Sequence, residues 1–220
     1  MNNSKTSQWD ILLREAYNLI DHVNRNHSII SSWTFGGGTA MMLQIGHRES
    51  HDVDLFLDDP QILPYLTAAV QEYDFKIGTP SYNGDGSGHL KIAFEGVGEI
   101  DFIVTGHMTA KYSTKKTILG RQIELETVPE IVAKKVRFRG SNIQPRDIFD
   151  IAAACHAGFM TDIKLALSKI PEFRAIAYAK LVKLNPEYVD KIISQLIVRP
   201  EYHEIAAKAV EITKLALADN

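Results

Sequence analysis

The feature that most constrains this chain is the alternation of acidic and apolar residues in Asp52-Val53-Asp54-Leu55-Phe56-Leu57. Residues two apart on a β-strand point to the same face of the sheet, so Asp52 and Asp54 share one face and the aliphatic residues between them point into the core. Neighbouring carboxylates repel each other, and a divalent cation would remove that repulsion. The segment therefore predicts a strand that either lies at a solvated edge with incidental acids or binds a metal ion.

A second segment of the same kind, Glu99-Ile100-Asp101-Phe102-Ile103-Val104, follows later in the chain. If this strand pairs beside the first, Asp101 completes a site of three carboxylates, with Glu99 one pleat away on the same face. Mg²⁺ prefers hard oxygen ligands and keeps water and substrate phosphates in its shell, and Mn²⁺ suits the same ligands. Two such ions about 4 Å apart stabilise the attacking and leaving oxygens of an in-line displacement at phosphorus.

Three consecutive glycines join an expected strand to an expected helix at Phe35 to Ala40. Glycines let the backbone approach a bulky anion, and the start of the helix directs unpaired N–H groups at it. The segment lacks the lysine of a P-loop, and Met41 occupies the place of the third glycine of a Rossmann fingerprint. A phosphate-binding turn and a plain strand-to-helix turn both remain open on this evidence.

Periodicity predicts a mixed α and β region followed by helices, with domains at residues 1–127 and 128–220. A glycine-rich segment, 81–88, is expected to hold no regular element and to act as a flap or as a hairpin connection. Strands are expected at 29–35, 52–58, 75–79, 89–94, 99–105, 117–119 and 122–125, and helices at 9–27, 39–45, 60–72, 129–139, 145–157, 161–169, 172–183, 187–196 and 200–217.

Composition narrows the cellular setting and the partners. The formal charge of −3 gives no overall attraction to nucleic acid, so an RNA contact would need a local basic patch. The chain has one cysteine, no visible signal peptide and no apolar run of the roughly 18 residues that span a bilayer. We expect a cytoplasmic protein without a membrane partner.

Taken together, the motifs resemble the DNA polymerase β-like nucleotidyltransferase superfamily, in which a glycine-rich helix start precedes Asp-x-Asp and a later strand supplies a third acid. More narrowly, the chain is similar to the AbiEii/AbiGii toxin family of nucleotidyltransferases. The matching pieces are Gly36-Gly37-Gly38-Thr39-Ala40, the run His47 to Phe56, Ala133-Lys134-Lys135, and Arg146-Asp147-Ile148-Phe149-Asp150. The resemblance implies an α+β fold, with a polymerase-β-like core of mixed sheet and flanking helices before a helical C-terminal region.

The resemblance also implies roles for particular residues. Asp52, Asp54 and Asp101 would bind Mg²⁺ or Mn²⁺, and Asp101 is alternatively the base that takes a proton from the acceptor hydroxyl. Lysine and arginine would offset charge on the triphosphate, with Lys135 as the expected catalytic lysine and Lys134 as the alternative. The expected nucleotide contacts are Gly37, Gly38, Thr39, Arg48, Lys134 and Arg146.

The activity that follows is transfer of a nucleoside monophosphate from an NTP to a hydroxyl group, with release of pyrophosphate. By the same resemblance, the acceptor is RNA, such as a tRNA 3′ end, or a protein, and an antitoxin would restrain the enzyme. The alternative is a catalytically silent nucleotide- or partner-binding module of the same fold. The basic residues of 129–139 could equally be a solvated face, and Arg146-Asp147 could be a structural ion pair.

Overall fold

The computed structural model describes residues 6–219 and divides into two compact units. Unit 1 comprises the chain up to Ala40, Ser50–Gly106 and Ser113–Leu125, and unit 2 comprises Met41–Glu49, His107–Tyr112 and the chain from Glu126 onward. The sequence predicts two folding domains with a boundary near residue 127, and this boundary stays a prediction.

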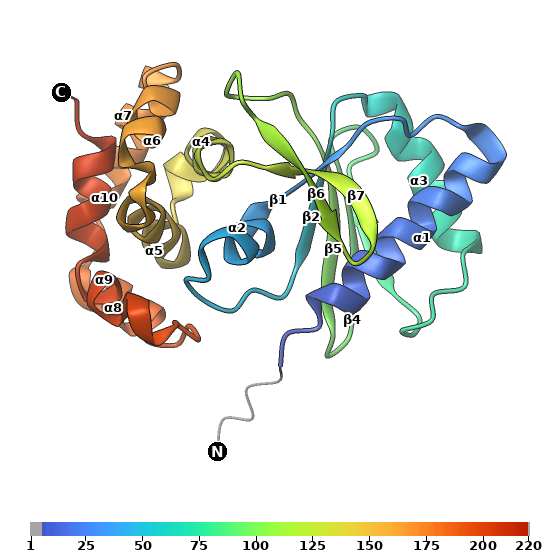
Figure 1. Ribbon diagram of the computed structural model, residues 1–220, viewed down its shortest axis with the longest axis horizontal. Helices are drawn as coiled ribbons and strands as arrows, with labels where there is room; N and C mark the ends of the chain where they lie inside the picture. The colour runs from blue at the N-terminus through green and yellow to red at the C-terminus, as the bar shows by residue number, and fades with distance from the viewer. Residues whose placement is uncertain (1–5, 220) are drawn as a thin grey trace. The chain divides into compact units, whose positions relative to one another are not determined.

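A mixed seven-stranded sheet forms the centre of unit 1, in the order β3-β4-β5-β2-β1-β7-β6 (Figure 1). Strand β2 pairs parallel with β5 and antiparallel with β1, and β1 pairs parallel with β7. The strands are β1 (Thr34–Gly36), β2 (Val53–Leu57), β3 (Ser81–Gly84), β4 (His89–Phe94), β5 (Gly98–Val104), β6 (Ser113–Ile118) and β7 (Arg121–Glu126).

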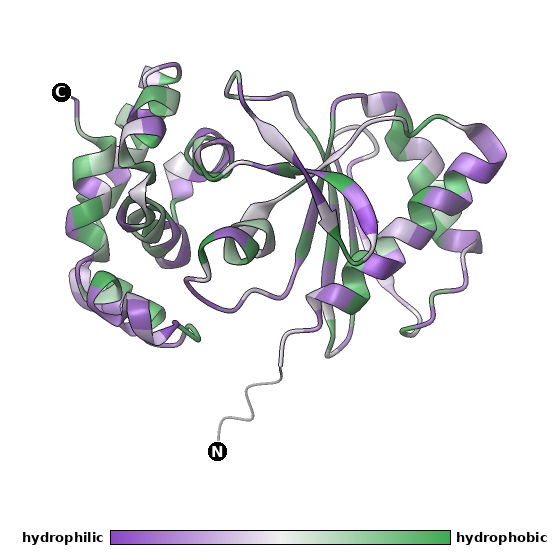
Figure 2. Ribbon diagram, in the orientation of Figure 1, coloured by the Kyte–Doolittle hydropathy of each residue, from purple (hydrophilic) through white to green (hydrophobic). Residues whose placement is uncertain are grey.

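Two helices pack on one face of this sheet, α1 (Trp9–His27) against β2 and β5 and α3 (Leu63–Glu72) against β4. Most apolar residues of α1 are buried, as their helical spacing predicts, and Ile11 is the exposed exception among its large aliphatic residues. The ribbon of α1 alternates between hydrophobic and hydrophilic residues in Figure 2. The alternate residues of β2 and β5 are buried under these helices, which leaves their acidic residues on the opposite face.

Two sequence predictions in the β-rich region are wrong. Residues 75–79 form no strand: a turn lies at residues 76–77, and Gly78 adopts a φ of 116° that an extended strand does not allow. Residues 81–84, expected to be irregular, form β3, because pairing with β4 supplies the hydrogen bonds that the local sequence does not favour. The segment is therefore the arm of a hairpin.

Unit 2 is helical and is built around α5 (Pro145–Ala154), in which every residue from Asp147 to Ala154 is buried. Prolines start four of its helices, where the missing N–H has no helical partner to lose. The other helices of unit 2 are the second half of α2 (Gly37–Ile45), α4 (Val128–Arg139), α6 (Met160–Leu167), α7 (Pro171–Leu181), α8 (Pro186–Ile193), α9 (His203–Ala207) and α10 (Ala209–Leu217).

Two expected helices of unit 2 are interrupted. The helix expected at 145–157 changes to a π-helical segment, Cys155–Phe159, where Gly158 has a φ of 96°. The helix expected at 200–217 divides into a 3₁₀ turn, α9 and α10, and Lys208 between the two helices has non-helical dihedral angles. Among the described residues, no helix is both long and apolar enough to cross a membrane.

Candidate active site

Five strands of unit 1 place one residue each in a single row across the sheet. Asp54 of β2 is the register partner of Asp101 of β5 on one side and of Gly36 of β1 on the other. Asp101 in turn pairs with Lys91 of β4, and Lys91 pairs with Asn83 of β3. Because register partners point to the same face, the row brings two carboxylates together with a lysine beside them.

The same face carries two further acids next to this row. Asp52 precedes β2, and its Oδ1 accepts a hydrogen bond from the backbone N–H of Glu99 at 3.2 Å. Glu99 lies two residues before Asp101, so its side chain shares the face. We call Asp52, Asp54, Glu99 and Asp101 the acid face. Its four negative charges on two adjacent strands would repel one another strongly without a cation.

The glycine turn is built directly against the acid face. Gly37 has a φ of 70°, and a Cβ atom added to it would lie 1.8 Å from Asp54 Oδ2 and 2.5 Å from Asp54 Cγ. Glycine is therefore required here both by the backbone angle and by the close carboxylate. Thr39 is fully buried, and its Oγ1 donates to the carbonyl oxygen of Asp52 at 2.5 Å. The turn that starts α2 is thus tied to the strand that carries the acids.

Two basic side chains from β4 contact the acid face. His89 Nε2 lies 2.6 Å from Asp101 Oδ1, and Lys91 Nζ donates to Glu99 Oε2 and lies 3.8 Å from Asp101 Oδ2. Partial burial lowers the pKa of Lys91, but the hydrogen bond to Glu99 and the charges of Asp101, Glu99 and Asp52 outweigh it and raise that pKa. Lys91 is therefore charged and acts as a counter-ion of the acid face.

An open depression of about 530 Å³ adjoins the acid face. It is bounded by the end of β4, the start of β5 and the segment before β2, so Asp52 and Glu99 belong to its wall. The lining residues are His51, Asp52, Ser81, Ala93, Phe94, Glu95, Gly96, Val97, Gly98 and Glu99.

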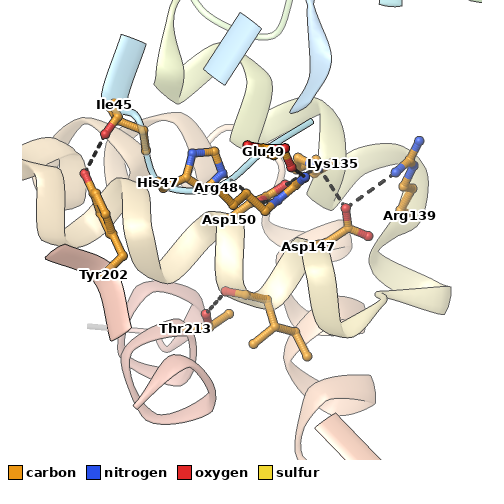
Figure 3. Close-up of polar contacts among 11 residues, drawn as sticks. Ile45, His47, Arg48, Glu49, Lys135, Arg139, Asp147, Asp150, Tyr202 and Thr213 are labelled. Atoms are coloured by element: carbon orange, nitrogen blue, oxygen red, sulfur yellow. Dashed lines mark hydrogen bonds and ion pairs between the residues drawn. The ribbon is translucent and has the colours of Figure 1, made fainter. Parts of the chain in front are cut away.

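Unit 2 contains a buried group of charges centred on Asp150 (Figure 3). Arg48 binds both oxygens of Asp150, with Nε to Oδ1 at 2.7 Å and NH2 to Oδ2 at 3.0 Å. His47 Nε2 lies 2.9 Å from Asp150 Oδ1, and Lys135 Nζ lies 3.0 Å from Asp150 Oδ2 and 2.8 Å from Asp147 Oδ1. We call these five residues the Asp150 cluster.

The cluster keeps its acids ionised despite their burial. Burial raises the pKa of Asp150, but the charges of Arg48 and Lys135 and the hydrogen bond from His47 hold it well below its usual range. Burial likewise raises the pKa of Asp147, and Lys135 and Arg139 more than offset it. For Lys135, burial lowers the pKa while Asp147 and Asp150 raise it by more. A buried group of this kind is costly to break, because removing one member leaves an uncompensated charge.

The other expected nucleotide contacts of unit 2 lie in different surroundings. Lys134 is buried, with Nζ 2.5 Å from Glu126 Oε1 and 3.7 Å from Glu130 Oε1. Arg146 is exposed at the start of α5. Asp147 also caps α5, because its Oδ2 accepts from the backbone N–H of Gln144. Nucleotide contacts by Arg48, Lys134, Lys135 and Arg146 stay predictions.

Sequence analysis missed His89 and Lys91, although a signal for both is present. Residues 89–94 alternate polar and apolar, and Leu90, Ile92 and Phe94 are the buried members. His89 and Lys91 therefore had to share the face opposite the core. The local sequence does not predict that β4 pairs with β5, the strand that carries Asp101, and this pairing brings His89 and Lys91 to the acid face.

The acid face offers only hard oxygen donors, which is the chemistry that Mg²⁺ and Mn²⁺ prefer. Within residues 6–219, no three side chains of His, Cys, Asp or Glu converge closely enough to hold a metal ion by themselves. Asp54 and Asp101 are the pair that the register brings together.

A family model described as "Nucleotidyl transferase AbiEii toxin, Type IV TA system" matches residues 24–218. The chain belongs to the AbiEii family. It is accordingly a nucleotidyltransferase of a toxin family, as the resemblance of its motifs implied. No curated protein matches its sequence.

Solved structures of two other proteins are similar to this AbiEii chain. One is ANT(2″)-Ia in complex with adenylyl-2″-tobramycin, with a TM-score of 0.52, 14% identity, and coverage of 76% of this chain and 97% of that one. Another is the nucleotidyltransferase toxin MenT4 of Mycobacterium tuberculosis, with a TM-score of 0.49, 15% identity, and coverage of 96% and 85%. The expected α+β nucleotidyltransferase fold is confirmed.

Proposed function

We propose that this AbiEii nucleotidyltransferase moves a nucleoside monophosphate from an NTP to a hydroxyl acceptor at the acid face. Mg²⁺ or Mn²⁺ would be bound by Asp54, Asp101 and Asp52 together with the NTP phosphates and water, which complete the ligand set that the carboxylates alone do not provide. The observation that carries the proposal is the register pairing of Asp54 with Asp101, with the Gly37 backbone packed against the Asp54 carboxylate. The pairing supports the proposal, because carboxylate oxygens from two strands then lie beside a turn suited to phosphate.

Each part of the site has a chemical task in this proposal. The backbone of Gly37 and Gly38 and the first N–H groups of α2 bind the phosphates of the NTP. The bound cation would offset the charge that develops on the phosphate oxygens. A bond forms between the acceptor oxygen and the α-phosphorus, the bond from that phosphorus to pyrophosphate breaks, and the hydroxyl proton passes to the Asp101 carboxylate.

The family supports the proposed acceptor and the proposed partner. Its description as a toxin of a toxin–antitoxin system supports an RNA acceptor, such as a tRNA 3′ end, or a protein acceptor, and an antitoxin protein that restrains the enzyme. A protein of the same fold, ANT(2″)-Ia, is described in complex with adenylyl-2″-tobramycin, which supports a small molecule as a further class of acceptor. We place the activity in the cytoplasm, where NTPs and RNA occur together.

The proposal is tested by incubating the protein with each α-labelled NTP, Mg²⁺ and total RNA. Transfer of label is expected for the wild type and is expected to fall by at least 100-fold in Asp54→Asn, because the asparagine amide is a poorer metal ligand than a carboxylate. Asp58→Asn is the matched control, since Asp58 is an exposed aspartate directly after β2, four residues beyond Asp54. Label transfer that survives Asp54→Asn, or is lost equally in Asp58→Asn, would overturn the assignment.

A further inference from the structure

The turn between β3 and β4 is held by one carboxylate. Asp85 Oδ1 accepts hydrogen bonds from the backbone N–H groups of Ser87, Gly88 and His89 at 3.0, 2.6 and 2.9 Å. These three bonds lower the pKa of Asp85 to about 2. The backbone N–H of Asp85 also donates to the carbonyl oxygen of His89 at 3.1 Å, so the turn closes on the first residue of β4. His89 therefore starts its strand in a defined position.

This turn delivers the His89 side chain to Asp101. The Nε2–Oδ1 distance of 2.6 Å is that of a strong hydrogen bond, and a carboxylate only accepts, so Nε2 carries the proton. The Asp101 side chain is 11% exposed and that of His89 is 38% exposed, so the bond lies at the edge of the acid face. Lys91 Nζ is nearer to the other oxygen, Oδ2, at 3.8 Å.

We propose that His89 is a positioning residue for Asp101, holding Oδ1 so that Oδ2 is the oxygen available for the cation or for the acceptor proton. This inference rests on the proposed function. The reason is geometric: a carboxylate rotates about its terminal torsion, and a donor fixed by the Asp85 turn selects one orientation. Partners of this kind that orient a metal ligand typically contribute about 10–100-fold to metal affinity or activity.

Two substitutions separate the role of Nε2 from the bulk of the ring. A glutamine side chain places its amide nitrogen close to the position of Nε2, whereas an asparagine places it near Nδ1, too short to reach Asp101. Mn²⁺ affinity is measured by calorimetry for the wild type, His89→Gln and His89→Asn, with thermal unfolding of each protein as the check on folding. A second readout, in metal-free protein, is the ¹⁵N NMR signal of the His89 ring.

The expected result is that His89→Asn weakens Mn²⁺ binding by about 10–100-fold, whereas His89→Gln stays within a few-fold of the wild type. The ring signal is expected to show a protonated, hydrogen-bonded Nε2 that changes in Asp101→Asn. Equal Mn²⁺ affinity in the wild type and His89→Asn, or a ring signal unaffected by Asp101→Asn, would overturn the positioning role alone. Absence of Mn²⁺ binding by the wild type would overturn the metal assignment and this inference with it.

Discussion

Asp54 and Asp101 occupy the same register position on adjacent parallel strands. Their side chains therefore project from one face of the sheet, although the two residues are 47 positions apart in the chain. Residues buried on the other face hold this register, because a slip of either strand by one residue would turn the acid of that strand into the core. The relationship thus follows from the hydrophobic pattern of β2 and β5.

Gly37→Ala is expected to abolish activity, because the added methyl group would lie 1.8 Å from Asp54 Oδ2 and must displace that carboxylate. The left-handed backbone angle adds a stability cost of about 1–2 kcal/mol. Gly120→Ala is the matched control, since Gly120 has a φ of 85° and open space around the missing Cβ. It should show a similar stability loss in urea unfolding with unchanged label transfer. Equal activity of the two variants would contradict the packing of Gly37 against Asp54.

Asp150→Ala is expected to lower the free energy of unfolding by about 3–5 kcal/mol, because it leaves Arg48 and Lys135 buried with one anion removed. Asp21→Ala, which removes an exposed ion pair with Arg121, is expected to cost about 1 kcal/mol or less. Urea unfolding of both variants measures the difference. Costs of equal size would show that the Asp150 cluster is not the stabilising element that its burial indicates.

The Asp150 cluster also determines how the free energy of unfolding changes at low pH. Asp147 and Asp150 have pKa values below those of an unfolded chain, so their contribution is present above about pH 3.9. It is lost as the pH falls through the folded-state values. Stability measured from pH 7 to 3 should therefore decrease steeply below about pH 4 in the wild type and less steeply in Asp150→Asn. Parallel profiles would contradict the depressed pKa values.

Lys91→Met is expected to tighten Mn²⁺ binding by about fivefold, because its partly exposed ammonium group competes with a cation for Glu99 and Asp101. A pair of charges about 4 Å apart in a water-like dielectric is worth about 1 kcal/mol. Lys115→Met, a change at an exposed residue of β6, removes the same charge away from the acid face and should leave the affinity unchanged. Calorimetry on the two variants measures the effect. Weaker binding in Lys91→Met would show that Lys91 supports the acids rather than competing for them.

Local sequence patterns predicted the strands whose acidic and apolar residues alternate. They failed where pairing with another strand determines whether a segment is extended. The alternation at 52–57 and 99–104 predicted two strands with acids on one face, and both are found. The turn at 76–77 and strand β3 were missed, because a glycine angle and pairing with β4 outweigh local preference there.

The Asp150 cluster shows a different limit of the sequence. Arg48 and Lys135 are expected from the sequence to contact the triphosphate. In the structure Arg48 pairs with Asp150, which lies 102 residues further along the chain, and Lys135 pairs with Asp147 and Asp150. Local periodicity does not predict the pairing of Arg48 with Asp150, because this contact forms only when the segment after α2 meets α5 in the folded chain. Their part in nucleotide binding stays a prediction.

The most direct test of the metal site is a double-mutant cycle between Asp54 and Asp101. The kcat/KM of label transfer is measured for the wild type, Asp54→Asn, Asp101→Asn and the double variant, with unfolding curves confirming that all four are folded. If both carboxylates act in one site, each single change should reduce kcat/KM about as much as the double change does. Reductions that multiply in the double variant would show that the two residues act independently, and the shared site would be wrong.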